Sequence, residues 1–75
     1  MFDKKVFGSR LLELRKKKKV SQTELGKLIG VTATQIGDME HGDSTTSMAR
    51  LYSLCKYFNV SSDYLLGLSD DPDPR

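Results

Sequence analysis

The sequence predicts an all-α domain of five short helices, and three observations lead to this prediction. Serine, threonine or aspartate residues stand at helix N-cap positions along the chain. Apolar side chains follow them at intervals of three and four residues, which is the spacing of one helix face. Glycine or asparagine closes most of these segments, as expected where the backbone turns left-handed at a helix end. The 75 residues suffice for one small core, and no second domain is expected.

The first helix is expected to begin after Asp3 and to end within the lysine run at residues 16–19. Its apolar residues recur at helical spacing and include Phe7, Leu11 and Leu14. Lysines at a helix C-terminus suit the negative end of the helix dipole. They also suit contact with phosphate groups, so both interpretations stay open.

Two helices separated by a glycine turn are expected within residues 21–42. Two residue pairs have the capping-box spacing, in which each partner satisfies a free backbone N–H of the other: Ser21 with Glu24, and Thr32 with Gln35. Between them, Gly30 can adopt a left-handed backbone at no steric cost. The spacing therefore predicts two short helices joined by a tight turn.

The second helix of this unit, expected at residues 33–41, has two different faces. Ile36, Met39 and Glu40 share one face, which we assign to the core. The outward face holds small and polar residues, namely Ala33, Thr34, Gly37, Asp38 and His41. Gly42 follows as the glycine that ends the helix.

Two further helices complete the prediction. Ser47 is expected to cap a fourth helix that ends near Asn59, and Ser61 a short last helix that ends before Gly67. We interpret Cys55, on the apolar side of the fourth helix, as a small core residue rather than a nucleophile. Residues 69–75 contain two prolines and three acidic residues, and we expect them to be disordered.

The charge is distributed unevenly although the net charge is only +2. Residues 1–20 carry eight Lys or Arg against two acidic residues, whereas residues 21–75 carry four against eight. This asymmetry fits a polyanionic partner, and equally a solvated charged face. One cysteine excludes an intrachain disulfide, and the absence of a Cys/His cluster argues against a metal site. Without an apolar run for a membrane span or a signal peptide, we expect a soluble cytoplasmic protein.

With these elements in place, residues 7–68 resemble the phage repressor and Cro family of helix-turn-helix DNA-binding domains, also called the xenobiotic-response-element-type family. The resemblance rests on five fragments in order: F-G-x-R-L-x-E-L-R from Phe7, V-S-Q-x-E-L from Val20, I-G-V-T from Ile29, I-x-x-x-E-x-G from Ile36 and N-V-S-x-D-Y-L-L-G from Asn59. It implies a compact five-helix, lambda-repressor-like domain with a helix-turn-helix motif at residues 21–41. The second helix would then lie across the DNA backbone, and the third would enter the major groove.

The resemblance also implies roles for individual residues. Gln22 and Thr32 match positions that contact phosphates, Gln22 also contacting bases, and Ala33, Thr34 and Asp38 match positions that contact bases. Gln35 beside them fits either capping or contact, and Asp38 fits either base recognition or simple repulsion of phosphate. The remaining expected DNA contacts are Lys18, Lys19, Ser44 and Thr45. Arg15 and Glu40 match an inward ion pair between the first and third helices.

The chain departs from the family pattern at several places, of which the turn after the first helix and the loop at residues 43–47 concern DNA binding most. Lys19 stands where relatives usually have glycine, which predicts a strained turn. The loop at residues 43–47 offers hydroxyls where many relatives have basic residues. We therefore expect a shallow salt dependence of DNA binding, with Arg10 and residues 16–19 supplying positive charge.

The function expected from the resemblance is a sequence-specific transcriptional regulator of bacterial or phage origin, acting as a repressor on double-stranded operator DNA. A palindromic site implies a homodimer, for which the expected contacts are Tyr64, Leu65, Leu66 and Leu68, although Leu65 fits a core position equally well. Two alternatives stay open: the antitoxin of a toxin and antitoxin pair, and a helical protein-interaction adaptor. An enzyme is not expected because the only histidine, His41, lacks a convergent partner, and the sequence indicates no cofactor or small-molecule ligand.

Overall fold

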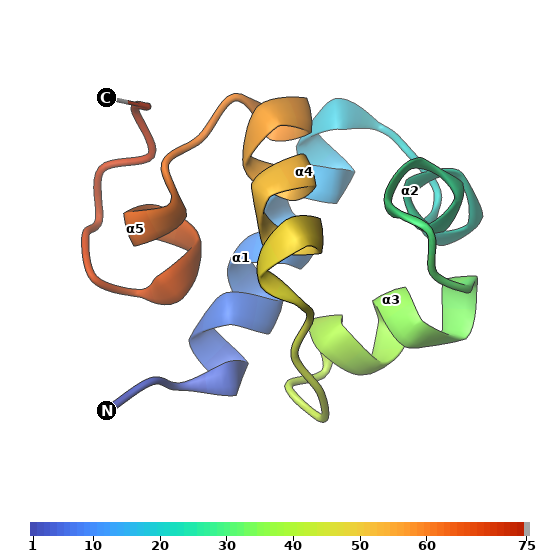
Figure 1. The fold of residues 1–75 in the computed structure, drawn as a ribbon, viewed down its shortest axis with the longest axis horizontal. Coiled ribbons are helices and arrows are strands. Elements are labelled where there is room, and N and C mark those ends of the chain that lie inside the picture. Colours follow the sequence, from blue (N-terminus) through green and yellow to red (C-terminus); the bar gives the residue numbers. More distant parts are fainter. Residues whose placement is uncertain (75) are drawn as a thin grey trace.

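The computed structural model describes residues 1–74, and the helical elements are α1 (Lys4–Lys18), α2 (Gln22–Ile29), α3 (Ala33–Glu40), α4 (Met48–Phe58) and α5 (Ser62–Leu66). The prediction of five short helices is confirmed. In the view of Figure 1, α1 lies behind α4 near the centre of the molecule. The α2–α3 unit lies on one side of this pair, and α5 with both chain termini lies on the other. In the described part of the chain, no helix is long and apolar enough to span a membrane.

The helix ends follow the capping residues that the sequence indicates. The N-caps are Asp3, Ser21, Thr32, Ser47 and Ser61, each of which accepts a hydrogen bond from a backbone N–H of the following turn. Both predicted capping boxes form. Gly30, Asn59 and Gly67 end their helices with φ values of 83°, 55° and 81°. Helix α3 ends at Glu40, one residue earlier than expected, and Gly42 with φ 80° completes the turn after it.

Lys19 ends α1 in the left-handed conformation that glycine normally adopts. Its φ and ψ are 59° and 40°, and its N–H donates to the carbonyl oxygens of Arg15 and Lys16. A side chain with a Cβ is disfavoured in this conformation by about 1 kcal/mol. The strained turn expected after the first helix is therefore present.

Nine apolar side chains form the core: Phe7, Leu11, Leu25, Ile29, Ile36, Met39, Leu54, Val60 and Leu65. Cys55 packs against this core, half-buried, and burial raises the pKa of its thiol. A neutral thiol is a poor nucleophile, which agrees with the interpretation of Cys55 as a packing residue.

Helix α1 approaches α3 so closely that only glycine fits at their crossing. A Cβ on Gly8 would lie 2.2 Å from the carbonyl oxygen of Met39 and 2.8 Å from that of Glu40. Because both atoms belong to the backbone, neither can move without displacing α3. Gly8 therefore determines how deeply α3 sits against α1.

Residues 69–74, the described part of the segment expected to be disordered, run back along α5. The backbone N–H of Ser61 donates to the carbonyl oxygen of Pro72 at 2.9 Å, and Arg10 Nη1 donates to that of Ser69 at 2.7 Å. The described part of this segment thus follows a defined path, in contrast to the expected disorder. The sequence did not indicate the path because the hydrogen-bond partners are distant in the sequence and produce no local periodicity. Arg75, the last residue of that segment, lies outside the described residues.

Candidate nucleic-acid interface

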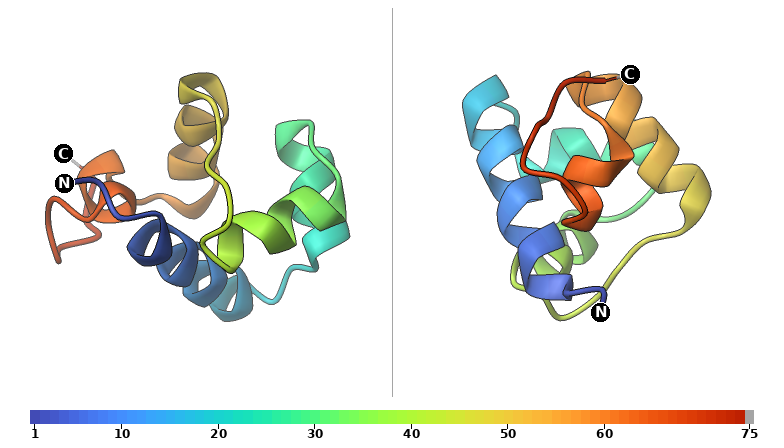
Figure 2. Two further views of the ribbon diagram at one scale, coloured as in Figure 1. Left: turned by 90° about the horizontal axis from the view of Figure 1, so that it is seen from below. Right: turned by 90° about the vertical axis from the view of Figure 1, so that its left-hand side faces the viewer.

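The α2–α3 unit lies at the end of the molecule opposite the two termini (Figure 2). Its turn is held by Gly26, whose carbonyl oxygen accepts hydrogen bonds from Gly30 N at 2.8 Å and Val31 N at 2.9 Å. Gly26 also permits a close approach, since a Cβ there would lie 2.5 Å from the carbonyl oxygen of Val31. Backbone hydrogen bonds and a close backbone contact therefore determine the orientation of α2 relative to α3.

The outward face of α3 carries the side chains expected to contact bases. Thr34, Gln35 and Asp38 are exposed, and Ala33 is half-buried at the start of the helix. Helix α3 has buried residues on its opposite face only, at Ile36, Met39 and Glu40. The exposed edge is therefore small at its N-terminal end and acidic one turn later.

Gln35 acts as a cap in this structure. Its Oε1 accepts a hydrogen bond from Thr32 N at 2.8 Å, while Thr32 Oγ1 accepts one from Gln35 N at 3.1 Å. Gln35 Nε2 donates no hydrogen bond within the described residues and stays free for an external acceptor. Thr32 is exposed beside it.

Glu40, at the end of α3, connects the unit to α1. Its carboxylate accepts from Arg15 Nε at 2.5 Å and from Arg15 Nη2 at 3.2 Å, although the side chain of Glu40 is only 3% exposed. Arg15 Nη1 also donates to the carbonyl oxygen of Val20 at 3.0 Å. The expected ion pair is thus bidentate and reaches the connection between α1 and α2.

Gln22 joins the same network and is not fully free for DNA. Its Nε2 donates to Glu40 Oε1 at 3.0 Å, and its amide lies over Gly37 of α3. One N–H of that amide is therefore held by Glu40, which orients the remaining N–H and the Oε1 atom. The structure places Gln22 between α2 and α3, at the start of α2.

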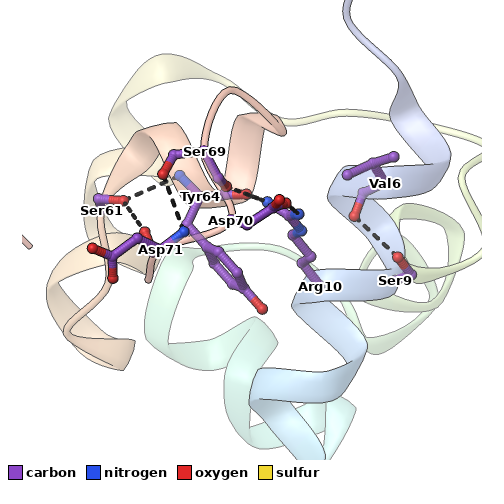
Figure 3. Close-up of polar contacts among 8 residues, drawn as sticks. All are labelled: Val6, Ser9, Arg10, Ser61, Tyr64, Ser69, Asp70 and Asp71. Carbon is purple, nitrogen blue, oxygen red and sulfur yellow. Dashed lines mark hydrogen bonds and ion pairs between the residues drawn. The ribbon is translucent and has the colours of Figure 1, made fainter. Parts of the chain in front are cut away.

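The positive charge expected to serve DNA binding is partly used within the protein. Lys18 Nζ donates to the carbonyl oxygen of Tyr57 at 3.1 Å and lies 4.4 Å from the centroid of its ring. Arg10 turns toward α5 and the tail, where it bonds to Tyr64, Ser69 and Asp70 (Figure 3). Arg10 is therefore not a source of charge for the α2–α3 unit, whereas Lys19 is exposed and has no side-chain partner among the described residues.

The loop between α3 and α4 forms a polar hollow against α3. Ser44 and Thr45 line it with Gln35 and Asp38, and its volume is about 340 Å³. Arg50 of α4 also lines the hollow and donates to the carbonyl oxygens of Ile29 at 3.2 Å and Gly30 at 3.3 Å. It thereby caps the C-terminal end of α2 from another helix. Sequence reasoning missed Arg50, because a contact across 20 residues leaves no local signal.

The residues expected at a dimer contact are not equally accessible. Leu65 is 0% exposed and belongs to the core, so its assignment to an interface was wrong. The position of Leu65 in α5 directs its side chain inward, in agreement with the alternative prediction that Leu65 is a core residue. Leu68 is 75% exposed, and Tyr64 and Leu66 are half-buried. Met48 and Tyr52 of α4 are also exposed.

Comparison with known proteins places these features in a family. A helix-turn-helix family pattern matches residues 11–65. An uncharacterized HTH-type transcriptional regulator of Bacillus subtilis, YobD, is 36% identical over 70 residues, which are 93% of this chain and 62% of that protein. Repressor protein C2 of Salmonella phage P22 is 36% identical over 61 residues, which are 81% of this chain and 28% of that protein. The chain thus spans less than two thirds of both relatives.

Two solved structures show the same fold. The P22 c2 repressor in complex with a synthetic operator superposes with a TM-score of 0.77 at 36% identity, covering 81% of this chain and 92% of that one. The restriction-modification controller protein C.AhdI of Aeromonas hydrophila gives 0.73 at 32% identity, covering 84% and 91%. Because the family pattern extends over most of the chain and the α2–α3 unit has its geometry, the protein belongs to the helix-turn-helix family.

Proposed function

We propose that this protein is a sequence-specific DNA-binding transcriptional regulator, acting as a repressor in the cytoplasm of a bacterial host. The observation that carries the proposal is the exposed edge of α3, where Ala33 and Thr34 precede Asp38 on a helix fixed from behind by Glu40. The P22 c2 repressor, similar over 81% of this chain, was solved in complex with a synthetic operator. That similarity supports DNA as the ligand of the same edge.

The physical basis is the fit of one helix into the major groove. Small residues at the start of α3 let the helix approach the base edges closely, and a methyl group of alanine or threonine can contact the thymine methyl. Asp38 can accept a hydrogen bond from cytosine N4. Around this edge, Thr32, Gln22 and the loop hydroxyls of Ser44 and Thr45 supply neutral donors for phosphates.

The protein is proposed to act as a homodimer on a palindromic operator. One domain of this size makes too few base contacts for genomic specificity, whereas two copies related by a two-fold axis double the contacts. Occupation of the operator would then exclude RNA polymerase. The exposed Leu68 and the half-buried Leu66 and Tyr64 are the proposed contact residues.

The experiment that tests the function is selection of bound sequences from a random DNA pool, performed with the wild-type chain and two variants. Ala33→Glu places a bulky anion on the small edge of α3 and is expected to abolish enrichment. Ser62→Glu makes the same charge change on exposed α5, where an acid suits the helix N-terminus, and should leave enrichment intact. The expected result is a motif with two inverted half-sites.

Two outcomes would contradict the proposal. Absence of any enriched motif at low salt would favour the protein-interaction adaptor. Equal enrichment by Ala33→Glu and wild type would remove α3 from the interface. Equal melting temperatures of the two variants, measured by circular dichroism, would confirm that folding does not explain the difference.

A further inference from the structure

The capping box at the start of α3 determines how the side-chain amide of Gln35 is oriented. Gln35 Oε1 accepts a hydrogen bond from Thr32 N at 2.8 Å, and Thr32 Oγ1 accepts one from Gln35 N at 3.1 Å. Because a backbone N–H can only donate, the amide atom that faces Thr32 has to be the oxygen. Nε2 is therefore the atom left for another partner, and it donates no hydrogen bond within the described residues.

The surroundings of Gln35 are rich in hydrogen-bond donors. The side chain is exposed and lines the hollow of about 340 Å³ between α3 and the loop before α4. Ser44 and Thr45 bring hydroxyl groups to the same hollow. Arg50 also lines it, and its Nη1 has no hydrogen-bond partner among the described residues. Although Asp38 adds a carboxylate to the wall, a group that enters the hollow meets mainly donors, which suits an acceptor.

The capping box of α2 has a charged residue at the position that Gln35 occupies in α3. There, Glu24 Oε1 accepts from Ser21 N at 3.1 Å. Hydrogen bonds with the backbone and then with the side chain of Ser21 lower the pKa of the Glu24 carboxyl. The box thus favours an ionised carboxylate, which also suits the positive end of the helix dipole. Within one chain, the box at the proposed DNA edge is the neutral one.

Folding alone does not explain why residue 35 is neutral. A glutamate at this position would keep the hydrogen bond from Thr32 N and would interact favourably with the helix dipole. Repulsion from Asp38, three residues further on, would oppose this gain by a similar amount. What glutamate lacks is the N–H groups of the amide. The choice of glutamine therefore indicates a partner outside the domain that accepts a hydrogen bond.

We propose that Gln35 contacts DNA as a donor only: the capping box holds its oxygen against Thr32, and Nε2 donates to an acceptor atom of DNA. That acceptor is either a phosphate oxygen at the hollow or the N7 and O6 atoms of a guanine. Bidentate pairing with adenine is excluded, because it needs the amide oxygen to accept from adenine N6. This inference rests on the proposed DNA-binding function.

The test uses two substitutions of Gln35 in the full chain. Gln35→Glu keeps the acceptor of the capping box but has no N–H, whereas Gln35→Met has neither group and no charge. Affinity for the selected operator is measured at the highest salt at which wild type still binds, so that charge effects are screened. Both variants should bind at least about tenfold more weakly, which corresponds to about 1.4 kcal/mol, the size of one hydrogen bond. Ser62→Glu on α5 is the control for net charge and should bind like wild type.

Weakening of both variants is expected only if the lost N–H group made the contact. Weakening of Gln35→Glu alone would assign the effect to its charge, and weakening of Gln35→Met alone would assign it to the lost cap. Either result, or wild-type affinity in both variants, overturns the inference and leaves the proposed function standing. A wild-type chain that binds no DNA would overturn the function and the inference together.

Selection of bound sequences from a random pool distinguishes the two acceptors. If Nε2 donates to a phosphate, both variants enrich the wild-type motif. If it donates to a guanine, one G·C position loses its preference, and Gln35→Glu favours cytosine there because a carboxylate accepts from cytosine N4. A preference for adenine over guanine that disappears in both variants would overturn the inference. Amide hydrogen exchange at Thr32 N should be as slow in Gln35→Glu as in wild type, since the capping box is kept.

Discussion

At the scale of single residues, Glu40 has the most consequential environment in the molecule. Its carboxylate is almost completely buried and is neutralised by Arg15, with a further hydrogen bond from Gln22. A buried ion pair adds little net stability, yet removal of one partner leaves an uncompensated charge that costs about 3 to 5 kcal/mol. The charge matters here because Glu40 belongs to the helix proposed to contact bases.

We expect Glu40→Ala to lower the free energy of unfolding by about 3 to 5 kcal/mol, since Arg15 would keep its charge at a 15% exposed site without an anionic partner. Urea denaturation followed by circular dichroism measures this change. Glu13→Ala is the control, because Glu13 is exposed on α1 and should change stability by less than about 0.5 kcal/mol. Equal urea midpoints for Glu40→Ala and Glu13→Ala would show that folding does not need the ion pair between Arg15 and Glu40.

At the scale of elements, the helices were predictable because their signals are local. Capping boxes, left-handed glycines and three-to-four spacing act within a few residues, so α2 and α3 could be located from residues 21–42 alone. Contacts between elements were not predictable in this way. Arg50 on the end of α2, Lys18 on Tyr57 and Arg10 on the tail join residues 20 or more positions apart, and each changes which cations remain free.

The connection between α1 and α2 offers a test at this scale. Lys19→Gly should raise the free energy of unfolding by about 0.5 to 1 kcal/mol, because glycine adopts φ 59° without the Cβ penalty. The free energy of unfolding should be measured at high salt, where the repulsion among the lysines of residues 16–19 is screened. Asn59→Gly, at the other non-glycine residue with positive φ, should gain less because asparagine tolerates this conformation. A destabilised Lys19→Gly would mean that the lysine side chain contributes contacts that outweigh the strain.

At the scale of the whole molecule, the distribution of charge decides how binding responds to salt. The excess of basic residues lies in residues 1–20, but the side chains of Arg10 and Lys18 are engaged in contacts with other parts of the chain. The loop beside α3 contributes hydroxyls and the carboxylate of Asp43. The edge of α3 and the loop beside it are therefore neutral to acidic, and we expect association with DNA to depend on shape and hydrogen bonds more than on counterion release.

This balance predicts a shallow salt dependence, with a slope of log affinity against log salt no steeper than about −4 per protomer. Thr45→Lys in the loop should steepen the slope by about 0.9, the value for one added phosphate contact. Ser62→Lys makes the same charge change on α5 and should leave the slope unaltered. If both lysines steepen it equally, net charge alone is responsible and the loop does not contact the backbone.

The close contact of Gly8 with the backbone of Met39 and Glu40 has a consequence for how such a protein can acquire new targets. The contacts that hold α3 against α1 and the core act on its inner face, through Gly8, Arg15 and the core side chains. Ala33, Thr34 and Asp38 on the outer face take no part in that support. Substitutions at these three positions can therefore change the preferred operator sequence with little loss of folding stability. This edge of α3 is the part of the molecule where relatives can diverge in target, and where a new target can be designed.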